Sequence, residues 1–233
     1  MRPRPEPADA GAAGFWPRWL AWSIDALCVA PLAAALAWTP LQPVQAQLGP
    51  ALGRLRAAVD GGVDRLLWAA DAPTNAPALL LALARDPALQ VAALELNARL
   101  AEALGILVVA WLAVAAAWWI GFEGLRGTTP GKRLLGLAVR CTDGADAGLA
   151  RAALRFLAGG LSWLSLNLGH ALAAVGPAHR ALHDHLAGTR VVYLDPTAPR
   201  MPRWGWPLVG MQASAALMAL AWLVLRWAQA LAG

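Results

Sequence analysis

The sequence predicts an all-α membrane protein with three transmembrane helices, a re-entrant or interfacial helical hairpin and a small cytoplasmic β-ribbon. Composition is the first reason: 59% of the 233 residues are hydrophobic and 14% are charged, which excludes a disordered chain and argues against a soluble globule. The second is length, because three apolar stretches, at about 16–38, 104–122 and 207–231, can cross or nearly cross a bilayer. The third is another apolar stretch, 152–176, whose glycines and polar residues predict an interruption.

The N-terminal segment 1–14 is rich in proline and alanine, and we expect it to form a disordered tail. The apolar run that follows is too long for a signal peptide and contains the ionisable residue Asp25. It therefore predicts an uncleaved first span at 16–38.

Basic residues set the predicted orientation in the membrane. The segment 123–155 is short and strongly basic, and short basic loops stay in the cytoplasm. Arg2, Arg4 and Arg18 place the N-terminus on the same side. We therefore expect a multi-pass protein of the bacterial inner (cell) membrane, with a cytoplasmic N-terminus and a cytoplasmic basic loop at 123–151. The partners expected for this loop are the lipid bilayer and its anionic lipid headgroups rather than nucleic acid.

The long segment 39–101 is predicted to be an extracytoplasmic helical insert. Leu52, Leu55 and Val59 recur at helical spacing. Asp86 and Pro87 have the form of an N-cap followed by proline at the first helical position, and this helix can continue into the second span. A helical hairpin on the outer membrane face is favoured over a ligand-binding domain.

The apolar stretch 152–176 could cross the membrane or enter and return. A crossing would place the arginines that follow it outside, against the positive-inside rule. Residues 167–169, Asn-Leu-Gly, indicate a helix break, and the segments 136–141 and 188–193 have the composition of short strands. Two strands can pair only on the same side of the membrane, so a returning hairpin is favoured. A linker, 194–206, then leads to the additional span at 207–231.

The turn at Thr128–Arg133 is similar to a phosphate-binding loop but fails its pattern. Arg126 stands where that loop requires glycine, and Arg133 stands where it requires serine or threonine. A tight turn that leads basic residues along the headgroups is the favoured interpretation.

Two histidines at helical spacing, His179 and His183, form the one metal-like cluster, together with Asp184 and His185. The cluster lacks the glutamate of a zinc protease. Pairing of Asp184 with an arginine such as Arg180 is favoured over a metal site. We expect no metal and no cofactor, and Cys28 and Cys141 imply no disulfide framework.

Asp25 is the only acidic or basic side chain between Trp19 and Trp38. An ionised aspartate at the centre of a membrane helix costs about 2.5–3.5 kcal/mol on insertion scales. Arg18 lies two turns earlier on the same helix face. Asp25 either neutralises an arginine of another segment or takes a direct part in the passage of a cation or proton.

Three segments resemble the RDD family of small membrane proteins, named for one arginine and two aspartates. The first is RWLAWSID, which contains Arg18 and Asp25. The second is GTTPGKRLLGLAV at 127–139, and the third is RALHDHLAGTRVV at 180–192. The resemblance covers 15–193, with Ala26 and the long segment 39–101 as departures from the family pattern.

The resemblance implies an intramembrane polar centre of Arg18 and Asp25 above a cytoplasmic motif. That motif consists of Thr129, Pro130, Gly131, Lys132, Arg133, Arg180, His183, Asp184, Gly188 and Thr189. Transport, including cation/proton exchange, has been suggested for some members, so transport of small ions is the leading hypothesis. A non-transporting membrane scaffold or assembly partner is the alternative. No catalytic constellation is recognisable, so we expect no enzyme. Three spans form a thin pathway, which favours a homo-oligomer or another membrane protein as partner.

Overall fold

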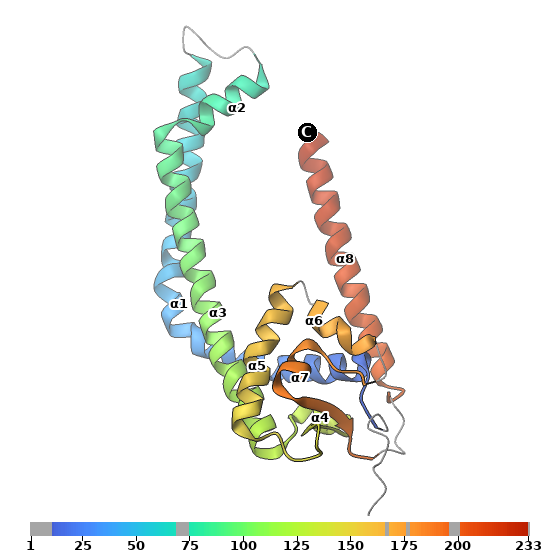
Figure 1. Cartoon of the computed structure of the whole chain (residues 1–233). Helices are drawn as coiled ribbons and strands as arrows, with labels where there is room; N and C mark the ends of the chain where they lie inside the picture. The colour runs from blue at the N-terminus through green and yellow to red at the C-terminus, as the bar shows by residue number, and fades with distance from the viewer. Residues whose placement is uncertain (1–10, 69–74, 166–167, 176–177, 196–200, 233) are drawn as a thin grey trace, which may run out of the picture. The chain divides into compact units, whose positions relative to one another are not determined.

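The computed structural model describes residues 11–68, 75–165, 168–175, 178–195 and 201–232. Its contacts divide the chain into unit 1, residues 1–29 with 115–233, and unit 2, residues 30–114. The elements in chain order, coloured in Figure 1, are α1 (Phe15–Leu67), α2 (Ala76–Ala84), α3 (Pro87–Arg126), α4 (Pro130–Leu134), β1 (Leu137–Cys141), α5 (Gly148–Leu164), α6 (Leu168–Ala171), the 3-10 turn η1 (Leu172–Ala174), α7 (Leu182–Ala187), β2 (Thr189–Tyr193) and α8 (Gly205–Ala232).

Among the described residues, three helices are long and apolar enough to cross a membrane. They are Phe15–Leu67, Pro87–Arg126 and Gly205–Arg226, and each contains most or all of one predicted span. Together with a two-stranded sheet, they confirm the predicted all-α membrane fold.

Unit 2 is built from residues 30–67 of α1, from α2 and from the first part of α3. Arg54 donates two hydrogen bonds to Glu95, at 2.8 and 2.6 Å. Arg65 lies 2.5 Å from Asp86, which also accepts the Ala88 backbone N–H at 2.8 Å and so caps α3. The insert 39–101 is therefore helical over most of its described residues, and α3 runs without a break into the second span.

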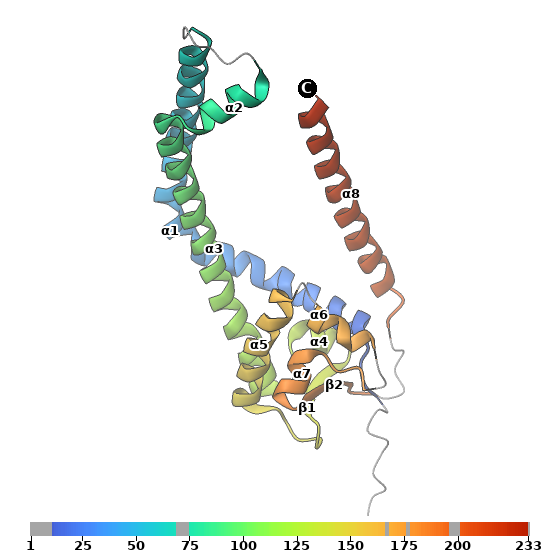
Figure 2. The ribbon, with the colours of Figure 1, turned by 45° about the horizontal axis from the view of Figure 1, so that its top comes forward.

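The sheet of unit 1 pairs β1 with β2 in antiparallel register, from Leu137 opposite Tyr193 to Cys141 opposite Thr189 (Figure 2). This is the predicted β-ribbon. The backbone N–H of Ala13 donates to Val191 at 2.9 Å, so the chain just before α1 extends the ribbon. Residues 1–10 of the predicted N-terminal tail lie outside the described residues, as do 196–200 of the predicted linker.

Between the two strands the chain leaves along α5 and comes back through α6, η1 and α7. These helices lie side by side in Figures 1 and 2. The helix α5 ends at Leu164 and α6 begins at Leu168; Asn167, part of the predicted break, lies outside the described residues. Because β1 precedes this path and β2 follows it, the pairing of the strands brings the end of the path back beside its start.

The last helix, α8, is held to the start of α1 by a polar contact. The Gln212 side-chain oxygen accepts hydrogen bonds from Trp19 Nε1 at 2.8 Å and from Ser23 Oγ at 3.3 Å. Most of the remaining surface of α8 is exposed and apolar, as expected of a helix that faces lipid.

Candidate functional site

Asp25 projects from an apolar turn of α1 and is fully buried. Its Oδ2 accepts a hydrogen bond from Thr129 Oγ1 at 2.5 Å. Its Oδ1 accepts two, from the Gly131 backbone N–H at 2.8 Å and from Trp118 Nε1 at 3.2 Å. Among the described residues Asp25 has no ion-pair partner, so three neutral donors hold this buried carboxylate.

The Thr-Pro-Gly sequence explains how α4 reaches Asp25. Thr129 is the N-cap of α4, and its hydroxyl oxygen accepts the Lys132 N–H at 3.3 Å while its proton goes to Asp25. Pro130 fits the first helical position. Gly131 has no room for a side chain, because a Cβ there would lie 2.9 Å from Asp25 Cγ and would also collide with the Ala21 carbonyl oxygen. Glycine lets the two backbones approach closely enough for the hydrogen bond.

Arg18 does not bind Asp25, although both lie on α1. Its Nη1 lies 2.5 Å from Asp184 Oδ2, and its Nε donates to the Ala13 carbonyl at 2.8 Å. Asp184, at the start of α7, is fully buried and also accepts the Ala181 backbone N–H at 2.9 Å. The signature arginine of α1 therefore joins the N-terminus to α7.

From Arg18 and Asp184, further buried side chains of alternating charge follow. Arg155 of α5 pairs with Asp184 on one side and with Glu123 of α3 at 3.0 Å on the other. Lys132 of α4 completes the chain, 2.7 Å from Glu123. Three cations and two anions from α1, α7, α5, α3 and α4 are thereby joined, and we call Arg18, Asp184, Arg155, Glu123 and Lys132 the charge chain.

Burial makes each link of the charge chain depend on the next. Taking a charge out of water costs several kcal/mol, which only a well-placed partner repays. Arg155 also donates to Thr189 Oγ1 at 3.1 Å, and so ties the start of β2 into the same cluster. Lys132, Asp184 and Thr189 of the motif inferred from sequence are thus connected through the charge chain, whereas Thr129 and Gly131 of the same motif bind Asp25.

His183 lies at the edge of the charge chain, with Nε2 3.8 Å from Asp184 Oδ1 and its ring 5.1 Å from that of His170. Burial, followed by the positive charge of Arg155, lowers the pKa of His183 well below its usual range. The imidazole is therefore neutral at pH 7.

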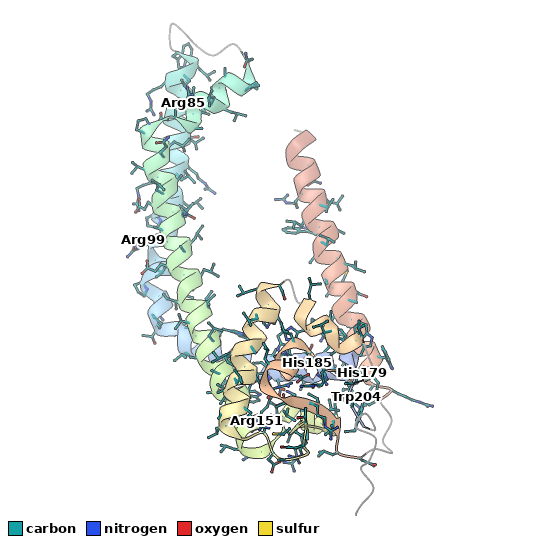
Figure 3. All side chains as sticks on the ribbon, in the orientation of Figure 1. Arg85, Arg99, Arg151, His179, His185 and Trp204 are labelled. Atoms are coloured by element: carbon teal, nitrogen blue, oxygen red, sulfur yellow. The ribbon has the colours of Figure 1, made fainter. Side chains whose placement is uncertain are left out.

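The structure does not bring the metal-like cluster together. His179 lies in the loop before α7, where its Nδ1 donates to the Ala173 carbonyl at 3.1 Å, and His185 is exposed (Figure 3). Within the described ranges, no group of three or more His, Cys, Asp and Glu side chains is placed to hold a metal ion.

The other motif residues support the turn between α7 and β2 or lie outside the cluster. Arg180 donates to the carbonyls of Asp184 at 3.0 Å and Thr189 at 3.2 Å. Gly188 ends α7 in the left-handed conformation at φ 63°, which favours glycine. Arg133 is exposed and contributes no contact of this cluster.

Sequence reasoning missed three residues of the site: Trp118, Glu123 and Arg155. Glu123 and Arg155 were counted only as the start and end of a basic loop. A usable signal exists for Arg155, because it lies among small residues on one face of an otherwise leucine-rich helix. That pattern indicates a buried charge with a partner.

The family comparison is consistent with this geometry. The model of the RDD family matches residues 12–188, which include Arg18, Asp25 and Asp184. No curated protein and no solved structure matches the chain significantly. Since the family model covers well over half of the sequence, the chain belongs to the RDD family.

Proposed function

We propose that this RDD-family protein transports small ions across the bacterial inner membrane by cation/proton exchange, with Asp25 as the group that takes up and releases the proton. The observation that carries the proposal is a fully buried carboxylate with neutral hydrogen-bond donors and no ion-pair partner in the described structure. Membrane helices keep such a residue mainly where it serves an ion or proton path.

The Thr129 hydroxyl makes protonation of Asp25 geometrically simple. With Asp25 ionised, the hydroxyl donates to Oδ2. With Oδ2 protonated, the carboxyl group donates and the hydroxyl oxygen accepts, because a hydroxyl serves in either role. Oδ1 can keep its two N–H donors in both states. The same contacts argue against direct binding of a metal cation at Oδ1, since donor hydrogens already occupy it.

A second candidate is the non-transporting scaffold or assembly partner, and the closed charge chain favours it. Its members are paired with one another, as expected of ion pairs that hold helices together. In this version Asp25 anchors α4 to α1 and carries no proton.

We also propose an orientation of the chain in the membrane. The N-terminus and the loop 123–151 face the cytoplasm, where exposed residues such as Arg126, Arg133 and Arg151 contact anionic lipid headgroups. Because three spans enclose little space, the transporting form is a homo-oligomer or a complex with another membrane protein. In this proposal the protein is not an enzyme.

Proton flux in inverted vesicles tests transport. Vesicles with matched amounts of wild type, Asp25→Asn or Asp143→Asn are energised, and a pH-sensitive dye follows proton movement after addition of Na⁺, K⁺ or Ca²⁺. Asp143 is an exposed turn residue, so its variant controls for loss of one carboxylate. We expect flux with wild type and Asp143→Asn and none with Asp25→Asn. Absence of flux in wild-type vesicles with all three cations, or full flux in folded Asp25→Asn, would overturn transport.

A further inference from the structure

The helix α5 exposes its leucines and buries its small and polar residues. Leu154, Leu157, Leu161 and Leu164 recur at steps of three and four, and are 47%, 69%, 51% and 84% exposed. The opposite face carries the buried residues Ala152, Arg155, Ala158 and Ser162. A helix on a water-facing surface has the reverse arrangement. The leucine stripe therefore needs an apolar environment beyond the protein.

Two contacts fix the direction of α5 beside the membrane helices of unit 1. Near its start, Leu149 packs so closely on Gly124, at the end of α3, that a Cβ at Gly124 would lie 2.8 Å from Leu149 Cα. Near its end, the Trp163 ring lies 5.6 Å from that of Trp22, which is about 10 Å along α1 from Phe15 at 1.5 Å per residue. The helix therefore runs from the end of one candidate span to a position two turns inside another.

The charged residues of α5 lie in its first half. Arg126, two residues after Gly124, and Arg151, in the first turn of α5, are both exposed. Figure 3 shows Arg151 at the end of α5 that is remote from α6. Beyond the buried Arg155, no residue of α5 is charged. Exposed residues after it, Leu168, Leu172 and Val175, are again apolar. The basic end matches lipid headgroups, and the apolar end matches acyl chains.

From these observations we infer that α5, α6 and η1 form a re-entrant membrane hairpin whose outer face binds the acyl chains of a single leaflet. The helix α5 enters from the side of the β-ribbon, the chain turns inside the leaflet after Leu164, and α6 with η1 brings it back. Its 17 residues give a length of about 25 Å, less than the roughly 30 Å thickness of the hydrocarbon core. The pairing of β1 with β2 requires the return. This inference does not depend on whether an ion is transported.

Depth-dependent fluorescence quenching tests the hairpin. The two cysteines are replaced (Cys28→Ala, Cys141→Ala), and single cysteines are introduced as Leu154→Cys, Leu157→Cys, Leu161→Cys or Leu164→Cys and labelled with bimane. The purified proteins are reconstituted in phosphatidylcholine–phosphatidylglycerol vesicles that contain lipids with a quencher at a shallow or a deep acyl position. Asp143→Cys, in an exposed turn, is the aqueous control.

We expect quenching by the deep lipid to increase steadily from position 154 to 164, since these positions are about 15 Å apart along the helix. Aqueous iodide should quench the label at 143 and not the labels at 157, 161 and 164. Equal depth at 154 and 164 would mean that α5 lies flat, and iodide access at 161 and 164 would mean that the stripe does not face lipid; either result overturns the inference. Retained far-UV circular dichroism and a single size-exclusion peak show that each variant is folded.

Sidedness provides an independent readout. Asp143→Cys precedes the hairpin, and His185→Cys, also at an exposed position, follows it. A membrane-impermeant maleimide should label both from the same side of oriented vesicles. Labelling from opposite sides would show that the segment crosses the membrane, and would overturn the hairpin.

Discussion

Replacement of Gly131 by alanine should separate α4 from α1 at the Asp25 site. The new Cβ would lie 2.9 Å from Asp25 Cγ and 3.0 Å from Oδ1, and against the Ala21 carbonyl oxygen. Ala21 is fully buried and its carbonyl belongs to the backbone of α1, so α4 has to move away. That movement lengthens the hydrogen bond between the Gly131 N–H and Asp25.

The expected cost follows from these two effects. Loss of a hydrogen bond to a buried charged group costs about 1.5–3 kcal/mol, and overpacking adds about 1–3 kcal/mol. The sum is roughly 2.5–6 kcal/mol, which at about 2–4 °C per kcal/mol lowers the Tm of a chain of this size by at least about 5 °C.

The assay is thermal unfolding in detergent, followed by tryptophan fluorescence. Gly210→Ala is the matched control, because Gly210 also lies in a helix but a Cβ there meets nothing within 4 Å. We expect the control to melt with wild type or slightly above it. If Gly131→Ala has the same Tm as Gly210→Ala, the close approach of α4 and α1 does not hold Asp25 as described.

Three further predictions concern the charge chain, the neighbouring His183 and α8. Arg155→Ala should lower the unfolding free energy by about 3–5 kcal/mol, because it leaves two buried carboxylates without their shared cation; Arg140→Ala, which removes only an exposed pair, should cost at most about 1 kcal/mol. The unfolding free energies of both variants, measured in detergent solution, check this prediction. Similar decreases for Arg155→Ala and Arg140→Ala would contradict it. Because the pKa of His183 is lowered in the folded protein, the unfolded state binds more protons, and the unfolding free energy should decline as pH falls below about 6.5. The decline should be shallower in His183→Asn. Identical pH dependence of the unfolding free energy in wild type and His183→Asn would refute the lowered pKa of His183. Gln212→Leu should weaken the attachment of α8 to α1 by about 0.6–1.7 kcal/mol. The check is cross-linking between Trp16→Cys of α1 and Trp206→Cys of α8, whose native rings lie 6.3 Å apart. We expect less cross-linking with Gln212→Leu than with Gln212 intact, and undiminished cross-linking would refute the prediction.

The sequence predicted the elements of the fold more fully than the contacts between them. Apolar length fixed the three spans, and the strand composition of 136–141 and 188–193 fixed the ribbon, because both depend on neighbouring residues. The continuous 53-residue helix α1 was not foreseen, since the first span was expected to end at residue 38 and the insert to begin at 39. The helix continues through Pro40, Pro43 and Pro50. Helical neighbours can satisfy the backbone groups that proline leaves unpaired.

Within the site, the signature residues were predictable and their partners were not. Arg18 and Asp25 are two turns apart on one helix, and this spacing suggested a shared centre. The structure gives them different partners, Asp184 and Thr129, because α4 and α7 approach α1 at different turns. Partner choice among side chains more than 100 positions apart depends on loop geometry, which local periodicity does not encode.

Asp25 also constrains how the chain is made. Its three partners lie 93, 104 and 106 residues further along. At about 5–20 residues per second, the ribosome needs roughly 5–20 s to synthesise that interval. During this time the three donors of Asp25 have not been made, so the full set of contacts at the carboxylate forms only after α3 and the Thr-Pro-Gly turn have emerged. We therefore expect the first helix to settle in the bilayer late, after the second helix has joined it, rather than as an independent insertion.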